Sequence, residues 1–435
     1  MSLYNLLAHA WIQLIPNHSE GMLRLLSAIF SIASIPLIYL LGCTLSNDRK
    51  RGMIIGLIGA ILVASNPFFI AYAQEFRSYS LTFFLTTLST YLFIKCFSQE
   101  DGGLLWKAFY AITASASVYS HFHAVFVIFA HFVAMSAFLF SWEKNREKLT
   151  SYFITGIGIF MLCLPILYIA YAKGSGQIGW LKKPTITSLY DFLSNLANGN
   201  KFFAISLFFV IIALFFSEGI KQKRSMVVQW RIWLIFGCLL IPVAMVFLLS
   251  IYLIPLFHNR YLLITMPYLS LLIAAGLLAF YAELWRFKYL KPVASVLAAS
   301  MIYFFANHVG IRISNHLERN SKEDWRNASQ YLADECSDAL RLYYRSYVVK
   351  PVYYYHPELR DLNDVLLENL IRTTSNPYEI ALKLPKSHTK ACVVLSHVPD
   401  KSKQKLIQDA LYNLYPKATG RKFSGIGILV FTKKN

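Results

Sequence analysis

Charged residues are scarce in this chain of 435 residues: Asp, Glu, Lys and Arg make up only 15%, whereas apolar residues make up 56%. A soluble protein of this length could not bury so much apolar surface, so a soluble globular enzyme is excluded. The sequence also has no Walker A loop and no zinc-type spacing among its cysteines. P-loop nucleotide hydrolysis and structural zinc binding therefore have no support.

One glycine-rich motif is present, but it lacks the structural context that it needs. Residues 174–179 read GSGQIG, which fits the G-x-G-x-x-G pattern of dinucleotide-binding proteins. That fingerprint requires a strand before it and a helix directly after it. Here a long apolar segment precedes the motif and WLKKP follows it. We therefore do not interpret it as a nucleotide site.

Long apolar runs are the dominant feature. A helix needs about 20 mostly apolar residues to cross a bilayer, and about ten segments approach this length. They are residues 22–43, 53–72, 80–97, 107–120, 123–141, 152–172, 202–217, 232–253, 262–281 and 292–308. The sequence therefore predicts a polytopic α-helical membrane protein.

The loops between these segments differ in their basic residues. Alternate loops are rich in Lys and Arg, at residues 49–51, 144–148, 221–231 and 286–291. The positive-inside rule places these loops in the cytoplasm, and the other loops on the extracytoplasmic face. Much of the net charge of +19 is thus a topology signal, and a nucleic-acid partner is not needed to explain it.

This topology divides the chain into three parts, of which 1–21 and 309–435 are extracytoplasmic and 22–308 is the transmembrane domain. In the first part, apolar residues recur at helical spacing: Leu3, Leu7, Ala10, Trp11 and Leu14. This spacing predicts a helix in the membrane interface. The outer loop 173–201 contains a similar helix, which we expect Thr187 to cap. The two helices either fill the interface or cover a cavity.

Residues 309–435 are polar and alternate between helix-like and strand-like stretches. We predict helices at 323–335, 364–371 and 403–415 and strands at 339–349, 391–398 and 425–434. This alternation indicates a small α/β domain with a partly parallel sheet.

Two of the six cysteines, Cys336 and Cys392, lie in this exported part, each next to a predicted strand. If the two strands are parallel neighbours, their cysteines are close enough to form a disulfide, which the extracytoplasmic side permits. The alternative is two buried thiols. The other four cysteines lie in or beside apolar segments and are interpreted as small apolar residues.

Polar residues gather at the outward ends of the predicted spans. They form three groups: Gln74, Glu75, Arg77 and Tyr79; His258, Arg260 and Tyr261; and Glu20 with Arg24. Such residues are either interfacial anchors or a site for a phosphate-bearing lipid, because arginine meets two phosphate oxygens at once. His121 and His123 are two residues apart, which would place them on different faces of a helix. We interpret them as interfacial histidines rather than metal ligands.

A set of motifs in a fixed order resembles a known family. The order LYNLLAHAW, SEGMLRLLSAIF, NPFFIAYAQEFRSYSL, YSHFHAVFVIF, GWLKKPTITSLYDFL, RYLLITMPYLSLLIAAGL and KEDWRNASQYLA is similar to bacterial glycosyltransferase family 39. These are GT-C fold enzymes, similar to protein O-mannosyltransferases and to the lipid A aminoarabinose transferase. The resemblance covers about residues 3–335.

The resemblance implies a multi-pass enzyme of the inner (plasma) membrane. Its donor would be a polyprenyl-phosphate sugar, its acceptor a lipid, glycan or protein, and its transfer an inverting one on the extracytoplasmic face. In this family a first membrane helix and a catalytic Asp precede the LYNLLAHAW stretch. The chain departs from the family there, and we expect it to lack that helix and the Asp, and so to insert poorly or be inactive as it stands. Turnover by this chain would refute that expectation and move the catalytic base to Glu75 or Glu20.

The roles that we expect for the site residues follow from this resemblance together with the chemistry of their side chains. Arg77 and Arg260 would bind the donor phosphate, and Tyr79 and Tyr261 would pack on the lipid or sugar, with Gln74 and His258 beside them. Glu75 would orient Arg77 or contact the sugar. Glu75 and Glu20 are the remaining candidates for the catalytic carboxylate. A divalent metal held by Glu20 and His258 is a further possibility. The competing functions are a transporter or flippase of polyprenyl-linked sugars and an inactive, lipid-binding paralogue.

Overall fold

The chain folds into two compact units, residues 1–313 and 314–435. The computed structural model describes residues 2–97, 103–140, 146–173, 181–197, 199–216, 226–318, 323–360, 363–373, 376–385, 387–396 and 401–433. The GSGQIG motif lies outside the described residues.

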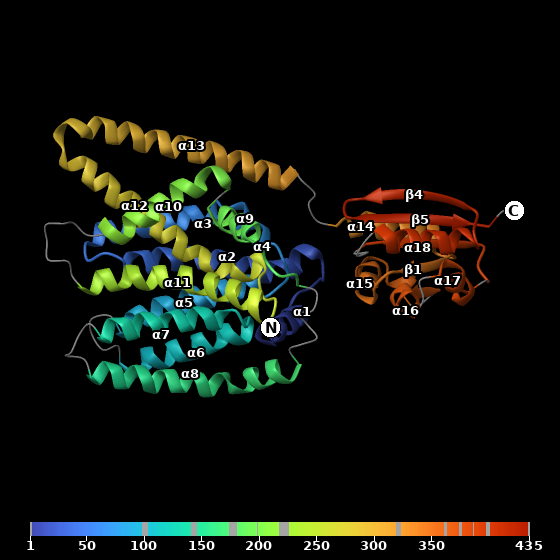
Figure 1. Cartoon of the computed structure of the whole chain (residues 1–435), viewed down its shortest axis with the longest axis horizontal. Helices are drawn as coiled ribbons and strands as arrows, with labels where there is room; N and C mark the ends of the chain where they lie inside the picture. The colour runs from blue at the N-terminus through green and yellow to red at the C-terminus, as the bar shows by residue number, and fades with distance from the viewer. Residues whose placement is uncertain are drawn as a thin grey trace. The chain divides into compact units, whose positions relative to one another are not determined.

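The first unit is a bundle of helices that run side by side (Figure 1). Its long helices are α2 (Glu20–Cys43), α3 (Arg49–Ala64), α5 (Tyr79–Phe97), α6 (Leu104–Ser120), α7 (Ala124–Phe140), α8 (Arg146–Lys173), α10 (Asn200–Phe216), α11 (Met226–Tyr252), α12 (Met266–Arg286) and α13 (Lys291–Glu318). Short elements are α1 (Ser2–Leu14), α4 (Pro67–Ala73), α9 (Ile186–Leu196) and the 3-10 helices η2 (Asn259–Thr265) and η3 (Lys288–Leu290). Most of the apolar segments expected to span the membrane coincide with one long helix, whereas 53–72 is divided between α3 and α4 and 262–281 begins in η2.

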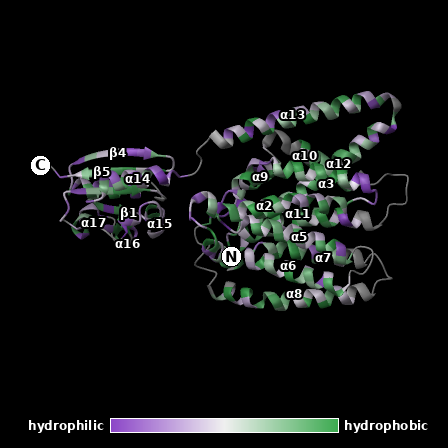
Figure 2. Cartoon of the chain, turned by 180° about the vertical axis from the view of Figure 1, so that it is seen from behind, coloured by the Kyte–Doolittle hydropathy of each residue, from purple (hydrophilic) through white to green (hydrophobic). Residues whose placement is uncertain are grey.

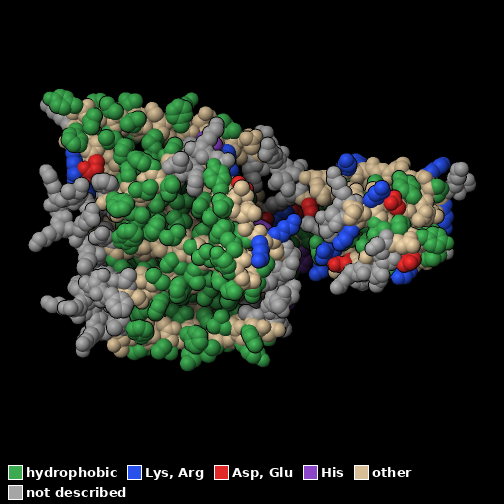
Figure 3. All heavy atoms as spheres, viewed as in Figure 1, with side chains coloured by type: hydrophobic (Ala, Val, Ile, Leu, Met, Phe, Trp, Pro, Cys, Tyr) green, Lys and Arg blue, Asp and Glu red, His purple; other side chains and the backbone are tan. Residues whose placement is uncertain are grey.

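The surface of this bundle is suited to lipid. Among the described residues, six helices are long and apolar enough to cross a membrane, or seven if the bent pair α3–α4 counts as one span. Only 17% of the most apolar part of α8 is buried, and its Phe160 and Met161 are exposed. Hydrophobic residues run along the helices in Figure 2 and cover the face of the bundle shown in Figure 3. Exposed apolar area on this scale marks a membrane surface.

The segment expected to form one span at 53–72 is broken into two helices. The helices α3 and α4 meet at an angle of 67°. Asn66 begins α4, and its side-chain oxygen accepts the N–H of Phe68 at 2.8 Å while Pro67 occupies the first turn. An Asn cap followed by Pro favours a new helix start over a continued helix.

The second unit is a five-stranded sheet with helices on both faces. Its strands are β1 (Leu340–Tyr343), β2 (Asp364–Leu366), β3 (Lys390–Leu395), β4 (Lys417–Phe423) and β5 (Ile426–Thr432), in the order β2-β1-β3-β5-β4. β1 is parallel to β2 and β3, whereas β5 is antiparallel to β3 and β4. The partly parallel sheet predicted from the sequence is confirmed.

Helices cover the two faces of this sheet. One face packs on α14 (Trp325–Cys336) and α15 (Ser346–Tyr355), and the other on α16 (Leu367–Thr373) and α18 (Lys401–Tyr412). The short helices η4 (Pro357–Leu359) and α17 (Pro377–Lys383) complete the unit.

Two element predictions in this unit were correct for only part of their length. The strand expected at 339–349 ends at Tyr343 and α15 follows, although its sequence is rich in strand-favouring residues. Val348 and Val352 are buried there, so packing outweighs local preference. The helix expected at 364–371 begins as β2, whose three residues pair with β1.

Cys336 and Cys392 form a disulfide, which is one of the two alternatives left open by the sequence. Cys336 ends α14, and Cys392 lies on β3 opposite Arg341 of the parallel neighbour β1. This pairing brings the two Cα atoms to 6.2 Å, and both side chains are fully buried.

Removing this disulfide should destabilise the second unit. The bridge joins residues 56 positions apart in the sequence, and closing so long a loop in the unfolded chain is worth about 4 kcal/mol in the entropy model. We expect the Cys336→Ala/Cys392→Ala double variant to lose about this much. Proteolysis of this unit in the full chain over a urea series measures the loss. The control is Cys43→Ala, which removes a free cysteine, and equal resistance of the double variant and the control would contradict the prediction.

Candidate functional site

Three loop segments of the first unit meet around the ring of Tyr261. They are the turn between α4 and α5, the turn between α6 and α7, and the start of η2. The Tyr261 ring centroid lies 4.8 Å from that of His121, 4.9 Å from His123, 5.3 Å from His258 and 6.2 Å from Tyr79. Residues far apart in the sequence thus form one aromatic cluster.

Two arginines belong to the same cluster. The guanidinium carbon of Arg260 lies 5.8 Å from the ring centre of Tyr79 and 5.3 Å from that of Tyr261. Arg77 is within hydrogen-bonding reach of the Tyr79 side chain and is exposed to solvent. Such contacts hold a cation in place without neutralising it. We name Arg77, Tyr79, His258, Arg260 and Tyr261 the arginine–tyrosine cluster.

Local hydrogen bonds shape the turn at residues 74–78. The N–H of Glu75 donates to the carbonyl of Tyr72 at 3.2 Å, and the N–H of Arg77 donates to the carbonyl of Glu75 at 2.7 Å. Ser27 of α2 donates its hydroxyl to the Arg77 carbonyl at 3.3 Å. The turn is therefore anchored to α2, and the Glu75 carboxylate lies close enough to act electrostatically on Arg77.

His258 caps η2. Its Nδ1 accepts the N–H of Arg260 at 3.4 Å, so the ring is an acceptor on that side. Burial, followed by the positive charges of Arg260 and Arg77, lowers the pKa of His258 to about 4. The imidazole is therefore neutral at physiological pH, and both arginines lie close enough to influence it electrostatically.

The remaining predicted site residues lie as follows. Gln74 is exposed and caps the end of α4. Glu20 forms an ion pair with Arg24 at 2.7 Å on the first turn of α2. The structure thus brings five of the eight predicted residues into the cluster, places Glu75 and Gln74 on the adjoining turn, and pairs Glu20 with Arg24.

The structure also bears on the residues considered as metal ligands. Among the described residues, no group of three or more His, Cys, Asp or Glu side chains could hold a metal ion. His121 and His123 lie in the turn between α6 and α7, where their ring centroids are 4.9 Å apart, so the separation expected for opposite faces of a helix does not apply.

The two amphipathic helices flank the site region. In α1, Tyr4 donates or accepts a 2.7 Å hydrogen bond with Ser27, and its ring packs on Phe76 at 5.8 Å. The cap of α9 is Thr185, not Thr187, because Thr185 and Ser188 form a capping box. Asn66 ties α4 to α9 by donating to the carbonyls of residues 195 and 196 at 3.2 and 3.1 Å.

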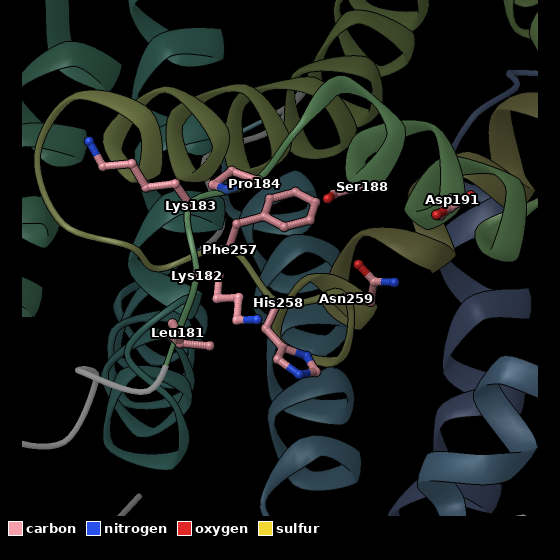
Figure 4. Close-up of a pocket in the computed structure, with 9 residues that line it drawn as sticks. All are labelled: Leu181, Lys182, Lys183, Pro184, Ser188, Asp191, Phe257, His258 and Asn259. Carbon is pink, nitrogen blue, oxygen red and sulfur yellow. The ribbon is translucent and has the colours of Figure 1, made fainter. Parts of the chain in front are cut away.

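A cavity of about 430 Å³ adjoins the cluster and shares His258 with it. Its lining comes from two segments, residues 181–191 and 257–259 (Figure 4). The polar lining residues are Lys182, Lys183, Ser188, Asp191, His258 and Asn259. The cavity therefore combines two cations, a carboxylate and neutral hydrogen-bonding groups.

Sequence reasoning did not single out Lys182, Lys183 or Asp191 as site residues. A signal was present: the two lysines are adjacent in a loop that the sequence predicts to be extracytoplasmic and that is otherwise poor in basic residues. Two cations there are unexpected under the positive-inside rule, so they call for a local role.

Lowering the pH should destabilise the first unit, because it contains the buried histidine His123. Burial lowers the pKa of His123 to about 4, although its bond to Leu256 opposes the shift. Unfolded histidine titrates near 6.5, so between about pH 6.5 and 4 the unfolded chain binds more protons than the native one. The contribution of His123 to the free energy of unfolding is therefore complete above pH 6.5 and is lost as the pH falls towards 4. The loss from His123 alone is on the order of 3 kcal/mol.

Thermal unfolding of the detergent-solubilised protein at several pH values measures this loss. His123→Gln, which cannot take up a proton, should lose less stability on acidification than the unmodified chain. An equal loss in the two proteins would contradict the assignment to His123.

Comparison with known proteins finds a similar structure but no match to a family or to a curated protein at the level of sequence. No protein-family model matches the sequence, and no curated protein matches it. A crystal structure of ArnT from Cupriavidus metallidurans in the apo state is similar over 98% of this chain and 87% of that one, with a TM-score of 0.56 and 10% identity. At this identity the likeness shows the fold alone, and membership of glycosyltransferase family 39 stays a prediction. The fold class is confirmed: this is a polytopic α-helical membrane protein of the GT-C type with a small C-terminal α/β domain.

Proposed function

We propose that this protein is a membrane glycosyltransferase that moves a sugar from a polyprenyl-phosphate donor to a lipid, glycan or protein acceptor. The observation that carries the proposal is the meeting of Arg77 and Arg260 around Tyr79 and Tyr261. Two cations that interact with the same tyrosine side chains suit a phosphate whose lipid chain enters from the bilayer. The ArnT-like fold supports the same reaction class.

In the proposed reaction an acceptor hydroxyl attacks the anomeric carbon of the donor sugar. The bond from that carbon to the phosphate oxygen breaks, and the proton of the hydroxyl passes to a carboxylate, for which Glu75 is the candidate beside Arg77. The leaving group is a polyprenyl phosphate, and Arg77 and Arg260 stabilise its charge without a general acid. Attack from the face opposite the phosphate inverts the anomeric configuration.

The disulfide supports an extracytoplasmic position for the second unit. Structural disulfides persist outside the cytoplasm and are rare within it. The distribution of basic loops gives the same orientation. We propose that the protein lies in the inner (plasma) membrane with the arginine–tyrosine cluster and the α/β domain on the extracytoplasmic side. The cavity of Lys182 and Asp191 then offers a route for the acceptor from that side.

A transporter of the same donor is the main competing function. It would place unsatisfied polar groups within the bundle, along a path for the sugar. The buried histidine of α7, His131, is instead enclosed by hydrogen bonds: its Nε2 lies 2.9 Å from the Thr90 hydroxyl and its Nδ1 lies 3.1 Å from the Tyr110 hydroxyl. This satisfied network holds helices together, which favours the transferase.

A transfer assay separates these functions. The purified protein in liposomes receives a polyprenyl-phosphate [14C]hexose and a lipid extract as acceptor. A transferase releases polyprenyl phosphate and yields a labelled product, whereas a flippase moves the intact donor across the bilayer. Donor translocation without cleavage, by protein that binds the donor, would overturn the proposal.

A further inference from the structure

The turn between α6 and α7 encloses two histidines beside the proposed donor site. His121 and His123 are each only 5% exposed. Both rings pack on Tyr261, whose neighbour in the chain is Arg260. They are therefore buried titratable groups in direct contact with the arginine–tyrosine cluster.

The hydrogen bonds of the two rings determine which nitrogen of each carries a proton. Burial lowers the pKa of both histidines, so each is neutral and has one N–H and one lone pair. Nδ1 of His121 accepts the backbone N–H of His123 at 3.3 Å, so the proton of His121 is on Nε2. Nε2 of His123 donates to the Leu256 carbonyl at 3.1 Å, so the lone pair of His123 is on Nδ1.

This leaves one donor and one acceptor unused. The Nε2–H of His121 and the Nδ1 of His123 have no hydrogen-bond partner among the described residues, and each atom exposes less than 1 Å². Buried polar groups are nearly always paired, so the two atoms require a ligand or an enclosed water. The ring centroids are 4.9 Å apart, close enough for one small group to serve both.

The chemistry of the two atoms selects the kind of partner. A hydroxyl both donates and accepts, and so matches an N–H beside a lone pair. A phosphate oxygen only accepts, and an ammonium only donates. A metal ion needs a lone pair from each ring, but the lone pair of His121 is already bonded to the backbone N–H of His123.

We propose that His121 and His123 form a hydroxyl-recognition pair that binds one hydroxyl of the sugar carried by the donor. The Nε2–H of His121 donates to the hydroxyl oxygen, and the hydroxyl hydrogen is donated to Nδ1 of His123. The Tyr261 ring packs on both imidazoles and the two nitrogens are buried, so neighbouring side chains have to move for the sugar to bind. The proposal rests on the proposed function and deepens it, because it assigns the sugar, rather than the phosphate, to these two residues.

Two conservative variants test the pair. His121→Asn keeps an acceptor for the backbone N–H of His123 but lacks the distal donor. His123→Gln keeps a donor for the Leu256 carbonyl but lacks the ring acceptor. Affinity is measured in detergent for polyprenyl phosphate without a sugar and for polyprenyl-phosphate glucose, mannose and galactose. Thermal unfolding of each variant without ligand confirms that it is folded.

We expect at least one sugar-linked lipid to bind the unmodified protein more tightly than the bare phosphate. Each variant should weaken that binding about three- to tenfold, the effect of one lost hydrogen bond, and leave the affinity for bare polyprenyl phosphate unchanged. Unchanged affinities, or an equal loss for both kinds of lipid, would overturn the pair and indicate an enclosed water or a structural role. The absence of any tighter sugar-linked lipid would overturn it as well. If the unmodified protein bound neither kind of lipid, the proposed function itself would fail.

Discussion

Replacing Glu75 by Gln should lower kcat for glycosyl transfer roughly 100- to 10,000-fold, the usual contribution of a general base. The amide has nearly the same shape but cannot accept the proton of the acceptor hydroxyl. Since we assign the donor phosphate to the two arginines and not to Glu75, we expect donor affinity to change little. Single-turnover transfer measures the rate, and equilibrium binding measures the affinity.

Two further variants make this result specific. Glu283→Gln makes the same change on α12, where Glu283 pairs with Arg286, and should leave the rate unchanged. Glu20→Gln tests the other candidate carboxylate, which forms an ion pair with Arg24. A large loss in Glu20→Gln with normal rates in Glu75→Gln would assign the base to Glu20 and refute the role of Glu75.

Replacing either cluster arginine by Lys should lower kcat/KM roughly 10- to 100-fold. A lysine ammonium keeps the charge but cannot make two parallel hydrogen bonds, and one bond to a charged group is worth about 1.5–3 kcal/mol. Arg260→Lys also alters the contacts of the guanidinium with the rings of Tyr79 and Tyr261. The matched control is Arg286→Lys. Normal transfer rates in both Arg77→Lys and Arg260→Lys, at normal expression, would contradict the assignment of the donor phosphate to these two arginines.

The helices were predictable because each carries a long apolar run, and the bundle must satisfy its backbone within the membrane. The break at Asn66 was missed because hydropathy averages over the two residues that cause it. Similarly, α15 was taken for a strand because its valines and tyrosines favour strands locally. Its place against the sheet is decided by packing, which a local pattern does not contain.

The candidate site was only partly predictable. Charge distribution placed Arg77 and Arg260 on one face of the membrane, and their chemistry suggested a phosphate. The position of the two arginines around Tyr261 depends on η2, a short 3-10 helix that a hydrophobic periodicity does not predict. The orphan nitrogens of His121 and His123 were also beyond prediction, because they follow from hydrogen bonds to backbone atoms whose positions only the fold determines.

The central claim is that Arg77 and Arg260 form a lipid-phosphate site, and ligand-dependent thermal unfolding tests it most directly. At a concentration of 100 times Kd, a bound ligand stabilises the native state by about 2.7 kcal/mol. We predict that polyprenyl phosphate raises the Tm of the unmodified protein, that neutral polyprenol of the same length does not, and that the Arg77→Lys/Arg260→Lys variant loses most of the shift. Equal stabilisation by the neutral polyprenol, or an undiminished shift in the double variant, would contradict the claim.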